Sequence, residues 1–185
     1  MTAVGDARHL TAAELEAGLA DVREAPRGVG RVELVVRRPQ VGRREVLAEA
    51  ELDLAEGLVG DRWVRGKRGR PPNPAAQLTL MSARAADLVA AGERERWALA
   101  GDQLYVDLDL SEEHLPAGAR LALGGAVVEV SAEPHTGCKK FVARFGLDAM
   151  RFVNSPEGRT LRLRGLNARV VEPGVVRAGD GIRVL

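Results

Sequence analysis

The sequence predicts a mainly β fold, in which short antiparallel strands form a closed or nearly closed barrel with a few peripheral α-helices. Many short segments have alternating apolar residues at close spacing, and Gly or Pro separates most of them. The strand–helix alternation typical of a parallel sheet is missing from this pattern. Many short strands with few helices are typical of barrels.

The first third is predicted to hold one helix and two strands. Residues 11–20 form the helix, with Thr11 as N-cap and Glu14 completing a capping box. The sequence then alternates with period two, which predicts half-buried strands over residues 31–38 and 44–54. The inward side chains of the two strands are expected to be Val32, Leu34 and Val36, and Val46, Ala48, Ala50, Leu52 and Leu54.

The middle of the chain is expected to contain strands over residues 76–82 and 101–110. Between them, residues 82–100 predict a helix whose middle Gly92 weakens. Gly124-Gly125 predicts the turn of the hairpin that follows.

The last part begins with a predicted helix over residues 138–154, which Gly146 interrupts. Short strands separated by Gly and Pro are expected after it, the first of them within "RTLRLRG". The 185 residues suit one domain. We expect residues 1–29 to be a helical extension packed on a barrel domain of residues 30–185.

Composition and charge exclude several classes of protein. No apolar run approaches the roughly 20 residues that cross a bilayer, and the N-terminus has no apolar signal core. A single cysteine cannot form an internal disulfide, so a cytoplasmic location without a membrane partner is expected. The net charge of +1, with only Trp63 near the basic loop, argues against nucleic acid as a partner.

Cys138 has two interpretations. Cys138, Phe141, Phe145, Ala149 and Phe152 are spaced like one face of a helix, which favours packing. However, "PHTG" places the cysteine at the expected helix N-terminus, where the macrodipole and neighbouring positive charges stabilise a thiolate. These neighbours are Lys139, Lys140 and His135.

The chemistry of a reactive thiol is narrowed by what surrounds it. A hydrolase needs a base beside the sulfur, and His9 and His114 have no motif around them. One cysteine and three scattered histidines match no zinc spacing. Two uses remain, which are a persulfide or sulfur carrier and a soft ligand to a metal held by a cofactor.

Four stretches together carry a resemblance to a known family, from Gly57 to the C-terminus. They are "GLVGDRW", "LAGDQLYVDLDL" with "LPAGARLALGGAVVEVS", "EPHTGCKKFVARFG" and "GLNARVVEPGVVRAGD". The sequence resembles the MOSC domains, named for the C-terminal domain of molybdenum-cofactor sulfurase, and most of all their small stand-alone bacterial members. The resemblance implies a barrel-like fold with a pocket for the molybdenum cofactor (molybdopterin), a phosphorylated pterin whose dithiolene holds the metal.

The resemblance also implies a function. Cys138 would be the catalytic thiol that carries sulfur or binds molybdenum. The implied reaction is sulfur transfer to the cofactor or molybdenum-dependent reduction of N-hydroxylated compounds. The alternative is a non-catalytic carrier of cofactor or persulfide. The sequence shows no pyridoxal-phosphate domain and no flavin or iron–sulfur motif. A cysteine desulfurase is therefore the expected sulfur donor, and a separate electron-transfer protein the expected reductant.

Arg162 and Arg164 alternate with leucines, so both are expected on one strand face, where they would anchor the cofactor phosphate or simply be solvated. The other expected cofactor contacts are Asp61, Arg62, Asp102, Gln103, His135 and Lys139. Asp61 has a structural alternative, bonded to Arg62 or to a backbone N–H. The basic loop of Arg65, Lys67, Arg68 and Arg70 would be a lid or a solvated loop, and "GLNAR" with Asn167 a turn.

Two positions depart from the family pattern. Gly137 stands where many members have proline directly before the cysteine, which changes the loop geometry. Gly101-Asp102-Gln103-Leu104 stands where the family usually has GEN-L. The order of acid and amide is kept, but the reach of each side chain changes.

Overall fold

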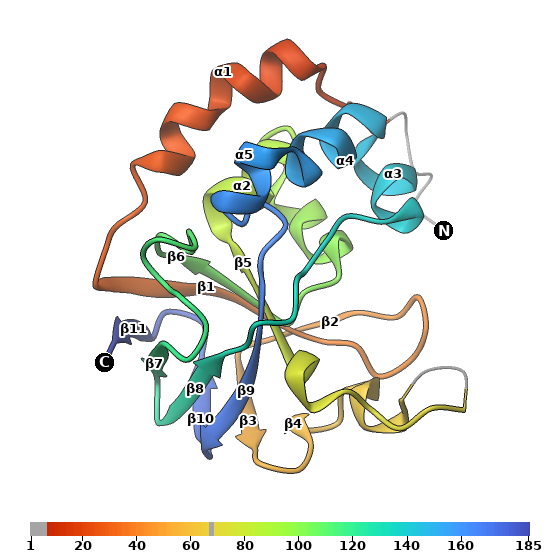
Figure 1. The fold of residues 1–185 in the computed structure, drawn as a ribbon. Helices are drawn as coiled ribbons and strands as arrows, with labels where there is room; N and C mark the ends of the chain where they lie inside the picture. The colour runs from red at the N-terminus through yellow and green to blue at the C-terminus, as the bar shows by residue number, and fades with distance from the viewer. Residues whose placement is uncertain (1–6, 67–68) are drawn as a thin grey trace.

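A closed barrel lies at the centre of the fold in the computed structural model, which describes residues 7–66 and 69–185 (Figure 1). The strands are β1 (Val29–Arg37), β2 (Glu45–Leu47), β3 (Glu49–Asp53), β4 (Gly57–Leu58), β5 (Leu78–Ser82), β6 (Leu104–Asp107), β7 (Arg120–Leu123), β8 (Ala126–Val130), β9 (Leu166–Glu172), β10 (Gly174–Arg177) and β11 (Gly181–Val184). Seven of them close in the order β11-β7-β8-β9-β5-β6-β1, since β11 also pairs with β1. The predicted barrel is therefore confirmed.

Two smaller features extend the barrel. β2 pairs only with β1 and lies outside the ring, and β10, β3 and β4 form a separate three-stranded sheet. Most strand pairs are antiparallel, but β5 and β6 are parallel. A parallel neighbour needs a crossover connection, and the helical segment between these two strands provides it.

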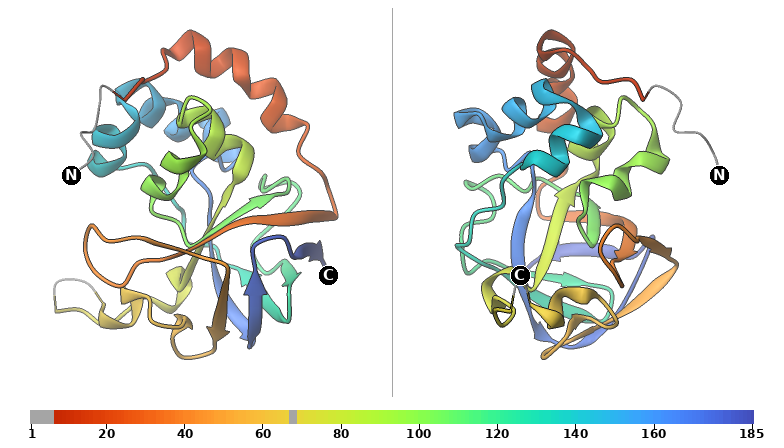
Figure 2. Two further views of the ribbon diagram at one scale, coloured as in Figure 1. Left: turned by 180° about the vertical axis from the view of Figure 1, so that it is seen from behind. Right: turned by 90° about the vertical axis from the view of Figure 1, so that its right-hand side faces the viewer.

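Helices gather at one end of the barrel (Figures 1 and 2). They are α1 (Ala12–Arg23), α2 (Ala83–Val89), α3 (Lys139–Phe145), α4 (Leu147–Asn154) and α5 (Pro156–Thr160), together with the 3₁₀ helix η3 (Arg94–Ala100), which contacts α2 and α3. Two further 3₁₀ helices, η1 (Arg62–Arg65) and η2 (Pro74–Ala76), lie near β4, away from this group (Figure 1). α1 begins with the predicted capping box of Thr11 and Glu14 and packs on α2 and α4. None of the described helices is long and apolar enough to cross a membrane.

The apolar core has two parts. One fills the barrel, and the other lies between the barrel and the helices. All five residues of β5 are buried because the strand belongs to both parts, with Leu78 and Leu80 inside the barrel and Met81 under the helices. Burying each leucine of this kind stabilises the fold by about 1.5–3 kcal/mol. Phe141 and Phe145 join the second part and fix α3 to the barrel.

The strand predicted over residues 44–54 is wrong in part. It divides into β2 and β3, and of its expected inward residues only Ala50 and Leu52 are buried. Val46 and Leu54 are exposed, as is Ala48. β2 leaves the barrel as a two-stranded extension of β1, and only Leu47 at its end packs against the barrel core.

The helix predicted over residues 82–100 also divides. α2 ends at Val89, the chain turns through Ala91 and Gly92 with positive φ, and η3 follows. Gly92 therefore ends the helix rather than weakening it. Gly146, with φ of 92°, separates α3 from α4 as predicted.

The strand predicted within "RTLRLRG" is wrong. Ser155 caps α5 with Pro156 in its first turn, and these helix-start signals override the alternation that follows. Arg162 then takes a left-handed φ of 49° in a turn. The turn predicted for "GLNAR" is wrong as well, because Leu166–Glu172 is β9, paired with both β5 and β8.

Candidate functional site

Cys138 is the N-cap of α3, and its side chain is exposed. Partial burial raises the pKa of the thiol. The backbone N–H groups of Phe141 and Lys140, then Arg164 and Arg144, outweigh burial and bring the pKa below its ordinary value. The positive charge at the sulfur therefore comes from Arg164, in the turn before β9, and from Arg144 in the last turn of α3, while Lys139 is exposed at the first position of α3.

The loop before the cysteine is held by one side chain. Asn154 Oδ1 accepts from Gly137 N–H at 2.8 Å, and Asn154 Nδ2 donates to Gly137 O at 3.1 Å. Proline has no N–H and could not make the first bond. A Cβ at position 137 would also approach Val153 Cγ2 to 3.1 Å. Gly137 thus fits this loop in a way that the proline common in the family would not.

Asp102 lies at the centre of a buried charge network behind the thiol. Arg164 Nη1 donates to its Oδ2 at 2.6 Å, and His135 Nε2 lies 2.9 Å from its Oδ1. Burial alone would raise the pKa of Asp102, but Arg164 and His135 outweigh it and hold the pKa well below the usual range. Burial, with Arg164, lowers the pKa of His135. A neutral His135 therefore donates from Nε2–H to an ionised Asp102.

Arg164 connects this network to α3. Its Nη2 donates to Ala100 O at 2.8 Å, and its guanidinium lies 5.2 Å from the centre of the Phe141 ring. The structure thus brings together four predicted site residues: Cys138, His135, Asp102 and Arg164. They come from the loop after β8, the loop before β6 and the turn before β9.

Further arginines lie around Gly101 or act on Arg44 through their charge, and we call them, together with Arg164, the basic cluster: Arg38, Arg44, Arg62, Arg144 and Arg164. A Cβ at Gly101 would lie 3.6 Å from Arg44 Nη2 and 3.7 Å from Arg144 Nη1, so both guanidiniums reach the same point. Burial is the largest cause that lowers the pKa of both guanidiniums. The charge of Arg144 also lowers the pKa of Arg44, and the charge of Arg164 also lowers the pKa of Arg144.

Carboxylates neutralise only two of the five arginines in the basic cluster. Asp61 accepts two bonds from the Arg38 guanidinium at 2.9 Å, and Asp102 accepts one from Arg164. Within residues 7–66 and 69–185, Arg44, Arg62 and Arg144 form no ion pair. The buried Nε of Arg44 has no hydrogen-bond partner among the described residues. The arrangement can therefore bind an anion beside the thiol.

Other predicted site residues have structural contacts. Asp61 is buried, accepts from Arg38 rather than from Arg62, and caps η1 through Trp63 N–H. Gln103 is buried, and its Oε1 accepts from the backbone and the hydroxyl of Thr79, both at 2.8 Å. Arg62 begins η1, and its backbone N–H donates to Arg38 O.

Arg162 and Arg164 do not share a strand face. Arg162 Nη1 donates to Leu115 O at 2.6 Å and to Leu110 O at 3.4 Å, whereas Arg164 pairs with Asp102. In the basic loop, Arg65 and Arg70 are exposed, and Lys67 and Arg68 lie outside the described residues. Asn167 is buried in β9 and donates to Glu133 O at 3.0 Å.

Sequence reasoning missed Arg38, Arg44 and Arg144. Arg38 precedes and Arg44 follows the turn in "RRPQVGRR", and Arg144 is in α3. No motif spacing links them, so only their basic character could have drawn attention. The part of the chain that the structure describes holds no group of three His, Cys, Asp or Glu placed to bind a metal ion.

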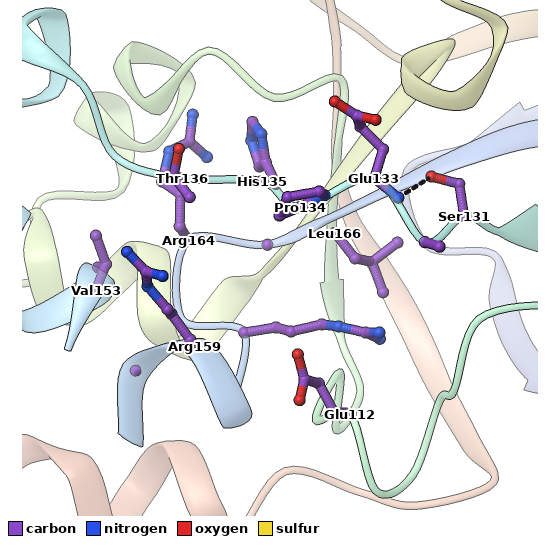
Figure 3. A pocket seen from close by; sticks show the side chains of 14 residues that line it. Glu112, Ser131, Glu133, Pro134, His135, Thr136, Val153, Arg159, Arg164 and Leu166 are labelled. Carbon is purple, nitrogen blue, oxygen red and sulfur yellow. Dashed lines mark hydrogen bonds between the residues drawn. The ribbon is translucent and has the colours of Figure 1, made fainter. Parts of the chain in front are cut away.

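A cavity of about 240 Å³ lies beside residues 131–136, the loop that precedes Cys138 (Figure 3). His135 and Arg164 line it, but Cys138 and Arg144 do not. The other lining side chains include Glu112, Glu133, Thr136, Arg159 and Arg162. The cavity is thus a neighbour of the basic cluster and shares Arg164 with it.

Comparison with known proteins agrees with this architecture. A family model described as "MOSC domain" matches residues 72–183. The fold resembles the YuaD protein of Bacillus subtilis, with a TM-score of 0.65 and 19% identity over 86% of this chain and 97% of that chain. It also resembles YiiM of Escherichia coli, with a TM-score of 0.55 and 21% identity over 84% of this chain and 69% of that chain. No curated protein sequence matches the chain.

Proposed function

This chain belongs to the MOSC domain family, which is associated with molybdenum-cofactor binding, and from this membership we propose that it binds that cofactor beside Cys138. The observation that carries the proposal is the pair Arg44 and Arg144. Both guanidiniums converge on Gly101 without a carboxylate partner among the described residues, and both have pKa values lowered by burial and neighbouring positive charge.

The donor set suits the cofactor's phosphate. Arginines bind phosphate oxygens through paired N–H groups, and a partly buried arginine with an orphaned Nε gains most from such a partner. Because position 101 has no Cβ, the space between Arg44 and Arg144 stays open. Arg38 Nη1 donates to Gly101 O, and this bond holds Arg38 in the basic cluster. We therefore assign phosphate binding to Arg44 and Arg144.

The reactive group of the proposed site is the thiol of Cys138. When bound, the cofactor would bring a molybdenum centre that accepts soft ligands and exchanges electrons. An exposed thiol with a lowered pKa is available as a thiolate, which can ligate this metal or carry a sulfur atom to it. Arg164 stabilises the thiolate and is itself held by Asp102. Gln103 and Asp61 support this site indirectly by fixing β5 and Arg38.

The expected reaction is sulfur transfer to the cofactor or reduction of an N-hydroxylated compound. Either one needs a partner, namely a cysteine desulfurase as sulfur donor or an electron-transfer protein. The two roles of Cys138 are separable by mass spectrometry. A sulfur carrier gains one sulfur atom when incubated with a desulfurase and cysteine, whereas a metal ligand does not.

The test is molybdenum and pterin analysis of the purified protein after loading with the cofactor. The wild type should retain both molybdenum and pterin. The double variant Arg44→Gln/Arg144→Gln should lose most of the pterin, whereas Cys138→Ser should retain it. Arg151→Gln is the matched control, because Arg151 is exposed on the neighbouring α4. If the wild type retains neither metal nor pterin, the proposal is wrong.

A further inference from the structure

One side of the molecule gathers cations around the Cys138 thiol. In Figure 1, α3, the hairpin loop between β1 and β2, and the segment that holds η1 lie along the right-hand edge, and in the back view of Figure 2 they again lie together, along the left-hand edge. We call these segments, which are residues 138–145, 37–45, 60–66 and 69–70, the basic face. They contain ten Lys or Arg and only two carboxylates.

Few of these cations are neutralised. Glu45 pairs with Arg37 and Arg43. Asp61 pairs with Arg38. Among the residues that the structure describes, the other seven cations of the basic face form no ion pair; they are Arg44, Arg62, Arg65, Arg70, Lys139, Lys140 and Arg144. Water solvates the exposed ones, but charges of one sign on one side still add up to a positive potential that reaches about a Debye length from the surface.

Two exposed cations lie directly beside the thiol. Lys139 and Lys140 follow Cys138 in the first turn of α3, and all three residues are exposed. Anything that docks over the thiol therefore meets both lysines.

A second pair of exposed cations lies on the other side of the basic cluster. Arg65 is the last residue of η1, and Arg70 follows it in the same segment, where its carbonyl approaches Gly66. η1 begins with Arg62, whose charge acts on Arg44 in the proposed phosphate site. The basic cluster thus connects the two exposed pairs, and the proposed cofactor site lies between them.

Exposed apolar side chains accompany these charges. Val41 in the hairpin loop is 74% exposed, Val46 in β2 is 61% exposed and Val64 in η1 is 38% exposed. Like charges with scattered apolar side chains suit a transient protein interface, which is small and electrostatically steered. Nucleic acid would need aromatic stacking platforms, and Trp63 is the only aromatic side chain in the described parts of the hairpin loop and the η1 segment.

We propose that the basic face docks an acidic electron-carrier protein. This inference rests on the proposed function, in which the cofactor lies beside Cys138 at the centre of this face. Reduction of an N-hydroxyl group breaks the N–O bond, forms N–H and water, and consumes a pair of electrons and a pair of protons. Because the sequence has no flavin or iron–sulfur motif, the carrier supplies the electrons, and solvent supplies the protons. Carboxylates around the carrier's redox group complement the two exposed pairs.

The test is isothermal titration of the full chain with a purified flavodoxin, a small acidic flavin protein. Binding should weaken about tenfold when the salt concentration rises from about 50 mM to about 300 mM, because salt screens exposed charges. The charge-reversed pairs Lys139→Glu/Lys140→Glu and Arg65→Glu/Arg70→Glu should each weaken binding at low salt about tenfold. Arg183→Glu is the matched control, because Arg183 is exposed in β11, at the opposite side of the molecule in Figure 1.

Three results would overturn the docking face. They are no saturable binding of flavodoxin at low salt, equal losses in Arg183→Glu and in the two charge-reversed pairs, and equal affinity for a short double-stranded DNA or for phosphatidylserine vesicles. The last result would indicate a general polyanion surface. The titration uses both the cofactor-free and the cofactor-loaded chain, and Arg65→Glu/Arg70→Glu should retain molybdenum and pterin like the wild type. A wild type that retains the cofactor without binding flavodoxin contradicts the docking alone, whereas one that binds flavodoxin but retains neither metal nor pterin contradicts the cofactor proposal.

Discussion

Arg164 donates from Nη1 to Asp102 Oδ2 at 2.6 Å, and both residues are buried. This pair lies between the exposed thiol of Cys138 and the cavity lined by His135. A buried pair is costly to break, because the remaining charge has no water and no counter-ion. Ionised Asp102 therefore supplies the counter-charge that Arg164 needs in its buried position.

Asp102→Asn should destabilise the fold strongly. The amide cannot balance Arg164, so the free energy of unfolding should fall by about 3–5 kcal/mol, as measured by urea denaturation at neutral pH. Asp21→Asn is the control, because the Asp21 carboxylate that pairs with Arg84 is 76% exposed, so the pair should contribute less than about 1 kcal/mol. Equal losses in the two variants would contradict a special role for the buried pair.

His135 should make stability depend on pH. Its pKa is lower in the folded chain, so the unfolded chain binds the proton first as pH falls below the ordinary histidine value of about 6.5. The stability that the folded chain gains from a neutral His135 is complete above that pH and is lost as the pH falls toward the pKa of His135 in the folded chain. His135→Gln should therefore lose less stability than the wild type between pH 7.5 and pH 5, in denaturation series at each pH. If the wild type and His135→Gln lose the same free energy of unfolding over this pH range, His135 does not cause the pH dependence.

The Cys138 thiol should react at lower pH than a free cysteine. Iodoacetamide alkylation of the cofactor-free chain, followed by mass spectrometry, should have its midpoint at a lower pH than alkylation of a free cysteine peptide. Arg144→Gln removes a neighbouring positive charge and should move the midpoint upward, whereas Arg151→Gln should not. A wild-type midpoint at or above that of free cysteine would show that the helix N–H groups do not stabilise the thiolate.

Gly137→Pro should be less stable than Gly137→Ala. Both substitutions add a Cβ close to Val153, but only proline removes the N–H that binds Asn154. The difference in the free energy of unfolding should be about 1 kcal/mol, the net worth of one hydrogen bond. Equal stability of the two variants would mean that the Asn154 bond does not hold this loop.

Elements with local signals were predictable. The capping box of Thr11 and Glu14, the hairpin turn at Gly124-Gly125 and the break at Gly146 each depend on neighbours a few residues away. The family resemblance likewise identified the barrel and Cys138 from contiguous stretches. Predictions failed where two local signals competed, as in the segment after Ser155, where a capped helix replaced the alternating strand.

The sequence by itself determined the barrel class, the family and the place of Cys138 at a helix N-terminus, because these depend on periodicity and short motifs. Only the tertiary structure decided which charges surround the thiol. Arg44 and Arg144 are 100 positions apart and converge on Gly101, and Asp102 selects Arg164 rather than Arg162. Interactions between charges depend on their distance and burial, and folding sets both by closing β1 onto β6 and β11 and packing α3 on the barrel end.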